Sequence, residues 1–162
     1  MKSIAGNFTT FTDVKNLKSI EEHGILSMRE IRSMGISPVT GGNQWSLDAD
    51  KAKGMDKFVH LCFFSSHPME YVAKKDGRIG ESKFLRIDPS ILRIPGALIA
   101  KDVSNKADAE YGPAEDMIEQ VDLEVIYTRT DWKDGKIKER LLLAKKSEIL
   151  IPDRVTLDYF KI

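Results

Sequence analysis

Hydrophobic residues occur along this sequence in short runs, most of them no longer than a single β-strand. Residues 8–12 combine aromatic side chains with threonine, which predicts a first strand. Residues 59–64 form a nearly continuous apolar run, as in a central strand that is buried on both faces. Further strands are expected at residues 84–87, 97–100, 121–128 and 148–151, with a turn and a final strand over residues 155–162.

Helical periodicity is less frequent than strand-like patterning. Val14, Leu17 and Ile20 recur every third residue and predict a helix that Gly24 ends. Shorter helices are expected over residues 28–34 and within 107–120, whereas the pattern of 137–146 fits a helix or an extended arm. Because short strands outnumber helices and do not alternate regularly with them, the pattern predicts an α+β fold.

Composition limits the class of protein. The chain has 162 residues, 25 of them basic and 25 acidic, so a single domain over residues 1–162 is expected and bulk electrostatic binding of nucleic acid is not. The single cysteine, Cys62, excludes an internal disulfide and is expected to be a small buried apolar residue. With no apolar stretch near ~18 residues and no apolar block at the N-terminus, we expect a cytoplasmic protein that has no membrane partner.

The common catalytic and metal-binding motifs are absent. The sequence has no glycine-rich phosphate loop, no His-Glu-x-x-His and no Gly-x-Ser-x-Gly. Asp122 and Glu124 have the spacing of a metal-dependent nuclease, but the lysine expected after the glutamate is missing. The histidines, which are His23, His60 and His67, show no metal-ligand spacing, so no metal is expected.

Three segments together resemble the DarT-type ADP-ribosyltransferases. Residues 10–20 read TFTDVKNLKSI and are followed by Gly24, which is similar to the opening strand and helix of that family. Residues 56–63 read DKFVHLCF and lead to a Pro-Met pair at residues 68–69, like the family's aromatic strand. Residues 144–152 read AKKSEILIP and resemble the family's terminal motif. A weaker match is the Asp-containing stretch 102–107.

The resemblance implies both a fold and an activity. The fold would be an ADP-ribosyltransferase-like split mixed β-sheet with short helices. Members of the family use NAD to attach ADP-ribose to a base in single-stranded DNA, usually thymine or guanine. They act as toxins and are typically paired with an antitoxin that removes the mark. RNA or protein as the acceptor, and a catalytically silent binding module of the same fold, are the alternatives.

The resemblance also implies site residues. Glu148 takes the position of the catalytic glutamate, and it opens an apolar strand, where its carboxylate can stabilise a positively charged ribose. The family's catalytic arginine lies upstream of the aromatic strand, where the only basic residues of 48–53 are Lys51 and Lys53. Either lysine can offer a cation, and Lys51 is the candidate. Thr10 stands where the family has a histidine. The candidate NAD-binding residues are Thr10, Phe11, Thr12, Ser19 and Ser27.

A local basic stretch precedes Glu148 in the sequence. Residues 133–146 hold six lysines and arginines, opposed by Asp134 and Glu139. We expect this stretch to guide a nucleic-acid backbone toward the site, and its salt dependence would test that. Trp132 can either stack on an unstacked base or anchor its loop on the core. The candidate nucleic-acid-binding residues are Trp132, Lys136, Lys145 and Lys146.

Overall fold

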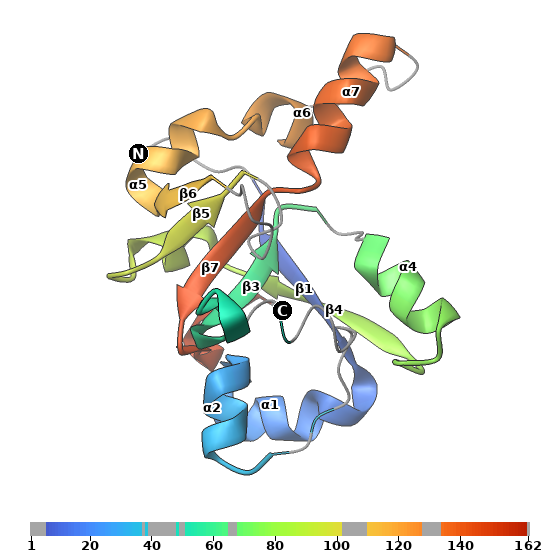
Figure 1. Ribbon diagram of the computed structural model, residues 1–162, viewed down its shortest axis with the longest axis vertical. Helices are drawn as coiled ribbons and strands as arrows, with labels where there is room; N and C mark the ends of the chain where they lie inside the picture. The colour runs from blue at the N-terminus through green and yellow to red at the C-terminus, as the bar shows by residue number, and fades with distance from the viewer. Residues whose placement is uncertain are drawn as a thin grey trace.

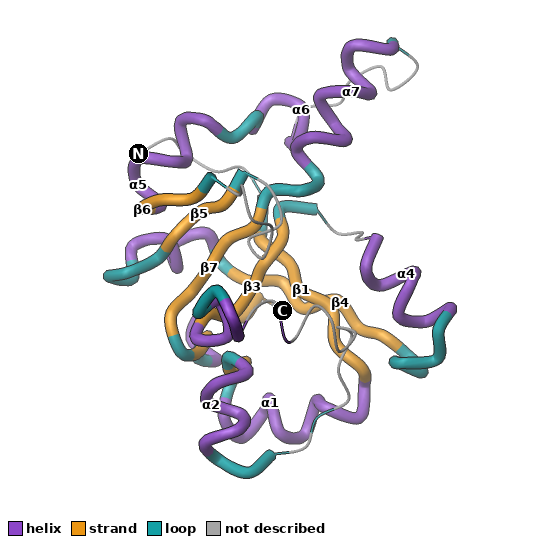
Figure 2. Tube along the Cα trace, in the orientation of Figure 1, coloured by secondary structure: helices purple, strands orange, loops and turns teal. Residues whose placement is uncertain are grey.

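The molecule is built on one large β-sheet with short helices around it (Figures 1 and 2). The computed structural model describes residues 6–36, 38, 48, 51–64, 68–101, 110–127 and 134–161. The large sheet has seven strands in the order β6-β5-β7-β3-β1-β4-β9. Their bounds are β1 Phe8–Asp13, β3 Phe58–Cys62, β4 Ser82–Ile87, β5 Leu98–Ala100, β6 Tyr111–Pro113, β7 Glu148–Pro152 and β9 Phe160–Lys161.

The remaining elements are short. A two-stranded sheet pairs β2 with β8, whose bounds are Ile25–Leu26 and Arg154–Val155. The α-helices are α1 Leu17–His23, α2 Met28–Ser33, α4 Pro68–Lys75, α5 Ala114–Met117, α6 Leu123–Tyr127 and α7 Gly135–Ala144. The 3-10 turns are η1 Val14–Asn16, η2 Met55–Lys57, η3 Pro89–Arg93, η4 Ile118–Gln120 and η5 Leu157–Tyr159. No helix among these described segments is long and apolar enough to cross a membrane.

The large sheet is split between β1 and β3. Among the described residues, β1 and β3 pair at a single position, Thr9 with Cys62, whereas β1 pairs with β4 at six positions and β3 with β7 at five. The sheet therefore consists of two halves joined at one point, as expected for a split sheet. The α+β class is confirmed. The word "mixed" needs correction, because every strand pair of the described part is antiparallel.

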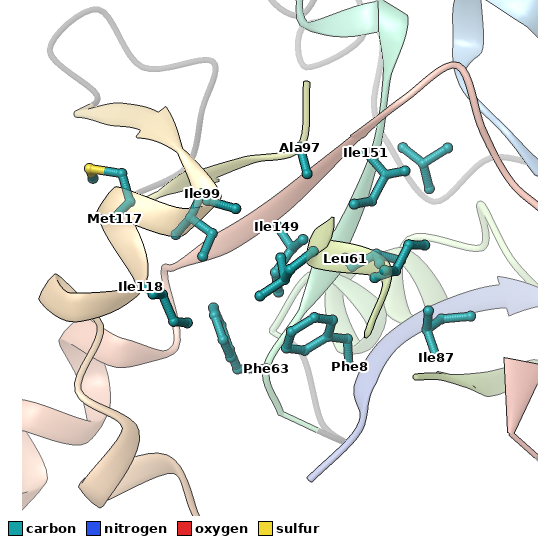
Figure 3. Close-up of a cluster of buried hydrophobic side chains, with 14 of the residues drawn as sticks. Phe8, Leu61, Phe63, Ile87, Ala97, Ile99, Met117, Ile118, Ile149 and Ile151 are labelled. Atoms are coloured by element: carbon teal, nitrogen blue, oxygen red, sulfur yellow. The ribbon is translucent and has the colours of Figure 1, made fainter. Parts of the chain in front are cut away.

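The main hydrophobic core lies against one face of the central strands. Val59 and Leu61 of β3 and Ile149 and Ile151 of β7 are all at most 4% exposed and belong to this cluster (Figure 3). We call this side of β3 and β7 the core face. Because side chains alternate along a strand, the residues between them lie on the other side, which we call the site face. A smaller apolar cluster, Met55, Phe58, Ala100 and Leu150, includes Phe58 and Leu150 from that face.

Gly24 ends α1 as the sequence predicted. Its φ is +77°, and its backbone N–H donates to the Ile20 carbonyl at 2.7 Å. A Cβ placed on Gly24 would lie 2.3 Å from the carbonyl oxygen of Val155 in β8. Both the left-handed backbone and the close approach of β8 therefore require glycine here.

One predicted strand is wrong. Residues 121–128 were expected to be a strand because apolar and polar residues alternate there, but Leu123–Tyr127 is the helix α6. The Asp122 carboxylate accepts the Val125 backbone N–H at 3.2 Å, which favours a helix start. Val121 and Val125, both buried, are four residues apart and share a side of the turn. Residues four apart share a side both in a strand and in a helix, so the pattern alone did not distinguish the two structures.

The other expected elements are confirmed. They are the strands predicted at 8–12, 59–64, 84–87, 97–100 and 148–151, the helix from 28, the described part of the partly helical 107–120 and the final strand. The helix predicted from Val14 begins as the 3-10 turn η1 and continues as α1. The open choice at 137–146 is settled as the helix α7, because the Asp134 carboxylate accepts the N–H groups of Lys136 and Ile137 at 2.9 and 3.3 Å. The single domain over residues 1–162 stays a prediction.

Candidate active site around Glu148

Glu148 lies at the centre of the large sheet. It is the first residue of β7 and pairs with Cys62 of β3 on one side and Ala100 of β5 on the other. Cys62 in turn pairs with Thr9, at the one point where the two halves of the sheet meet. The Glu148 side chain is 14% exposed. The strand that Glu148 was predicted to open is present, and it places this carboxylate beside the split.

His60 contacts Glu148 across the two strands. Its Nδ1 lies 3.2 Å from Oε2 of Glu148, and its Nε2 lies 3.1 Å from the carbonyl oxygen of Met55 in η2. His60 pairs with Leu150, so Glu148 is its diagonal neighbour on the site face. The sequence reasoning missed this residue, because it considered His60 only as a possible metal ligand. Only the register of β3 on β7 brings positions 60 and 148 together.

Cys62 is the third residue of this group on the site face. It is half-buried, and loss of hydration raises the pKa of its thiol to about 12, with the negative charge of Glu148 acting in the same direction. The thiol is therefore neutral, and it is a poor nucleophile at ordinary pH. The expectation of a small buried residue holds only in part, since Cys62 keeps some exposed surface.

The turn η2 connects this group to helix α2. Met55, whose carbonyl holds His60, is buried, and the next residue, Asp56, pairs with Arg32 of α2. The Asp56 side chain is 12% exposed. The ion pair with Arg32 of α2 therefore holds the turn η2, whose Met55 carbonyl contacts His60. Arg32 lies outside residues 48–53, where the sequence reasoning looked for a cation.

The candidate NAD-binding residues of β1 are distributed over both faces of the sheet. Because Thr9 pairs with Cys62, alternation places Thr9 and Phe11 on the side that carries Glu148, and Thr10 and Thr12 on the side of the core. Phe11 packs near Phe84 with ring centroids 6.0 Å apart. The Thr12 hydroxyl accepts a hydrogen bond from the Asn16 amide at 3.1 Å.

The remaining candidates for NAD and for the cation lie on other elements. Ser27 is 1% exposed and caps α2, since its hydroxyl accepts the Glu30 backbone N–H at 3.3 Å. Ser19 is half-buried on α1, and Lys51 is exposed three residues before Gly54. The described contacts do not bring Lys51 together with Glu148. No group of three or more His, Cys, Asp or Glu side chains suited to a metal occurs in the part of the chain that the structure describes.

Helix α7 carries Lys136, and a short turn that contains Lys145 and Lys146 connects it to β7 (Figure 1). Lys136 and Lys146 are exposed and Lys145 is half-buried, whereas Trp132 lies outside the described residues. Ser147 fixes the turn between α7 and Glu148, because its hydroxyl donates to the Lys101 carbonyl at 3.4 Å.

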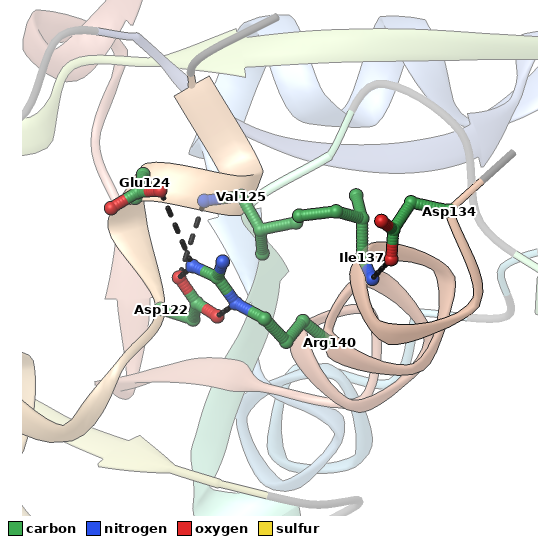
Figure 4. A network of polar contacts seen from close by, with 6 residues as sticks. All are labelled: Asp122, Glu124, Val125, Asp134, Ile137 and Arg140. Carbon is green, nitrogen blue, oxygen red and sulfur yellow. Dashed lines mark hydrogen bonds and ion pairs between the residues drawn. The ribbon is translucent and has the colours of Figure 1, made fainter. Parts of the chain in front are cut away.

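Arg140 of α7 forms an ion pair with Asp122 within the protein. Its guanidinium donates to both carboxylate oxygens of Asp122, at 2.7 and 2.8 Å, and lies 3.7 Å from Glu124 (Figure 4). The hydrogen bonds from Arg140 hold the pKa of Asp122 below its usual value. The pair with the nuclease-like spacing, Asp122 and Glu124, thus fastens α6 to α7.

Comparisons with known proteins agree on one family. A family model described as "ssDNA thymidine ADP-ribosyltransferase, DarT" matches residues 9–162, which confirms the resemblance found in the sequence. No curated protein sequence matches the chain. Among solved structures, Thermosipho africanus DarTG in complex with ADP-ribose has a TM-score of 0.74 at 19% identity, covering 96% of this chain and 43% of that one. The chain thus spans less than half of the Thermosipho protein.

Two structures of Thermus sp. 2.9 DarT also match. The complex with ADP-ribosylated ssDNA has a TM-score of 0.65 at 16% identity and covers 94% of this chain and 79% of that one. The complex with NAD+ has a TM-score of 0.66 at 16% identity, with 99% and 82% coverage. At these identities the likeness establishes the fold.

Proposed function

Because the chain belongs to the DarT family of ssDNA thymidine ADP-ribosyltransferases, we propose that it transfers ADP-ribose from NAD+ to thymidine in single-stranded DNA. The observation that carries the proposal is the position of Glu148, a half-buried carboxylate on a central strand at the point where the sheet splits. The ligands of the Thermus relative, NAD+ and ADP-ribosylated ssDNA, agree with this donor and acceptor.

The proposed chemistry needs one well-placed carboxylate. The bond between nicotinamide and the ribose C1′ breaks, nicotinamide leaves with the bonding electrons, and the ribose becomes positively charged. The Glu148 carboxylate stabilises that charge, and its limited exposure strengthens the interaction because little water screens it. A ring nitrogen of the base then bonds to C1′ and loses its proton, which a carboxylate can accept.

The transfer assay is direct. Labelled NAD+ is incubated with the protein and with oligonucleotides that differ only in having one thymidine or none. We expect label on the thymidine-containing single strand, and loss of that label with Glu148→Gln. Glu115→Gln, at an exposed glutamate of α5, is the matched control. Label on RNA or protein instead would identify an alternative acceptor, and no transfer with no NAD+ hydrolysis would favour a silent binding module.

Helix α7 is proposed to guide the DNA strand. The lysines that follow its C-terminal end, Lys145 and Lys146, lie three and two residues before Glu148, and Lys136 is exposed near its other end. Replacing Lys145 and Lys146 by glutamine should weaken the binding of single-stranded DNA. The slope of log K against log[salt] should become less steep by about 0.7 for each phosphate contact that is lost. Lys75→Gln on α4 is the control. An unchanged salt slope would remove α7 from the interface, and Trp132→Ala tests stacking separately.

The proposed NAD contacts are Thr10, Phe11, Thr12, Ser19 and Ser27, with Lys51 as the cation. Phe11 has the best support, since it shares the side of β1 that faces Glu148. We expect Phe11→Ala to raise the KM for NAD+ more than Thr10→Ala does. An equal effect of the two substitutions would contradict this ranking.

A toxin role with an antitoxin partner is also proposed. It is supported by the family and by the Thermosipho DarTG relative. Expression of the wild-type chain should slow bacterial growth, and Glu148→Ala should relieve the effect. A neighbouring reading frame that encodes an ADP-ribose-removing enzyme would support the partner, and harmless expression of an active chain would contradict the toxin role.

A further inference from the structure

We propose that His60 is a positioning residue that holds the Glu148 carboxylate through one shared proton, and that this proton must be present for the transfer. The inference rests on the proposed function only for its kinetic consequence. The pairing itself follows from the two contacts of the imidazole, with the Met55 carbonyl and with Glu148.

The Met55 contact fixes which ring nitrogen carries a hydrogen. A carbonyl oxygen has only lone pairs and accepts hydrogen bonds, so Nε2 of His60, 3.1 Å away, must be the donor. In a neutral ring the other nitrogen, Nδ1, is then bare. Nδ1 lies 3.2 Å from Oε2 of Glu148, and two lone pairs do not bond at that distance. The contact therefore contains one further proton, on the imidazole or on the carboxyl group.

The other titratable groups described near the pair are neutral or compensated. The other titratable group of β3 on this face, Cys62, stays neutral because burial and Glu148 raise the pKa of its thiol to about 12. Asp56 of η2 is paired with Arg32 of α2. Arg154 of β8 is paired with Glu30 of α2, at 3.1 Å. Asp56 and Arg154 are thus each compensated by a charge on α2.

The charges on the flanking strands point the same way. On β1, Asp13 accepts the backbone N–H groups of Lys15 and Gly80 at 2.8 Å, which lowers the pKa of its carboxyl group. Beyond β5, Lys101 lies 3.5 Å from Glu110. Lys57 of η2 lies over the Phe58 ring, 5.5 Å from its centroid.

The shared proton gives His60 a role that packing alone would not give. While the proton is present, the imidazole fixes Oε2 and holds the carboxylate in one orientation on the site face. When the pH rises and the proton leaves, the bare Nδ1 repels Oε2 and the orientation is lost. We therefore expect kcat to fall on the alkaline side of the profile, with the KM for NAD+ changing less, because orientation matters most in the reacting complex.

The pairing can be measured without any activity. Nitrogen-15 spectra of the histidine side chains report the protonation state of each ring nitrogen across a pH titration. We expect Nε2 of His60 to keep its hydrogen throughout, and the ring to titrate about one pH unit or more higher in the wild type than in Glu148→Gln. The ring-nitrogen signals of His23, which lies 3.6 Å from the exposed Glu22, are an internal control that the substitution should leave in place. Equal titration of His60 in the two proteins would overturn the proposal.

Two substitutions then test the kinetic role. His60→Leu removes the donor and should lower kcat roughly 10- to 100-fold. His60→Asn keeps a donor at the position of Nδ1 that does not titrate, so it should recover part of kcat and lose the alkaline decline. Equal kcat values and unchanged pH profiles for both variants, with only the melting temperature lowered, would show a purely structural histidine. A wild-type protein that transfers nothing to DNA would refute the proposed function, while the titration would still decide the pairing.

Discussion

The two faces of β3 and β7 are built from alternate residues of the same short segments, yet they differ in what they hold. On the core face, Val59, Leu61, Ile149 and Ile151 are nearly or fully buried in one apolar cluster. On the site face, His60, Cys62 and Glu148 lie beside the smaller cluster that contains Leu150. Residues that point to one face of these strands therefore pack in the core, and their sequence neighbours point to the other face and form the candidate site.

This separation has a physical basis in the period of a strand. Successive side chains point to opposite faces, so a residue and its sequence neighbour have different surroundings although their backbones are bonded. A carboxylate on the core face would lose its hydration without a partner, whereas on the site face it has His60 and some access to water. Substitutions at adjacent positions should then act on different properties.

The largest effect is expected at Glu148. Glu148→Gln should lower the transfer rate on the order of 10²- to 10³-fold, because an amide has no charge to stabilise the positive ribose. The free energy of unfolding should change by about 1 kcal/mol or less, since the side chain keeps its size and a hydrogen-bonding group. Steady-state kinetics and chemical denaturation measure the two quantities. A large loss of stability with an unchanged rate per folded molecule would contradict the division between the faces.

The next residue should show the opposite behaviour. Ile149 is fully buried on the core face, so Ile149→Ala should cost about 2–5 kcal/mol of unfolding free energy, through lost burial and the cavity that remains. The rate per folded molecule should stay near that of the wild type. Leu142→Ala, which removes a side chain that is 54% exposed on α7, is the control and should be nearly neutral.

A smaller effect is expected at Cys62, and it tests how closely the site face is coupled to Glu148. With a thiol pKa of about 12 against an ordinary value of 9.0, alkylation of the folded protein should be roughly 10³-fold slower than that of the unfolded chain. Glu148→Gln should accelerate alkylation, since it removes the charge that helps to raise this pKa. Rates with iodoacetamide, followed by mass spectrometry, measure both. Equal rates in the two proteins would show that the charge does not reach the thiol.

The smallest effect lies at the edge of the sheet, away from both faces of the central strands. Lys161 of β9 contacts Asp88 at 2.8 Å, and this hydrogen bond, with the Ser90 N–H, lowers the pKa of Asp88 to about 2. A lowered folded-state pKa adds stability above about pH 4, which is lost as the pH falls toward 2. Asp88→Asn should therefore make the melting temperature depend less on pH over that range. Asp158→Asn, at an exposed aspartate of η5, is the matched control substitution.

The sequence predicted those elements whose pattern fits one period. The apolar run at 59–64 and the segment after Glu148 have strand length, and they contain the strands β3 (Phe58–Cys62) and β7 (Glu148–Pro152). Residues 121–128 fit two periods, and the helix start at Asp122 with the Arg140 bridge decided between them. Local spacing cannot reveal a partner 18 residues away.

The site divides in the same way. The sequence alone indicated the family, and the resemblance proposed Glu148 as its catalytic glutamate, because three ordered segments with a carboxylate at the start of an apolar strand form a local pattern. Only the tertiary structure decided that His60 is its partner. These residues are 88 positions apart and meet because antiparallel pairing sets Cys62 opposite Glu148, which brings His60 diagonally next to it. Strand register is a property of the whole sheet, fixed by the burial of one face, and no single segment contains it.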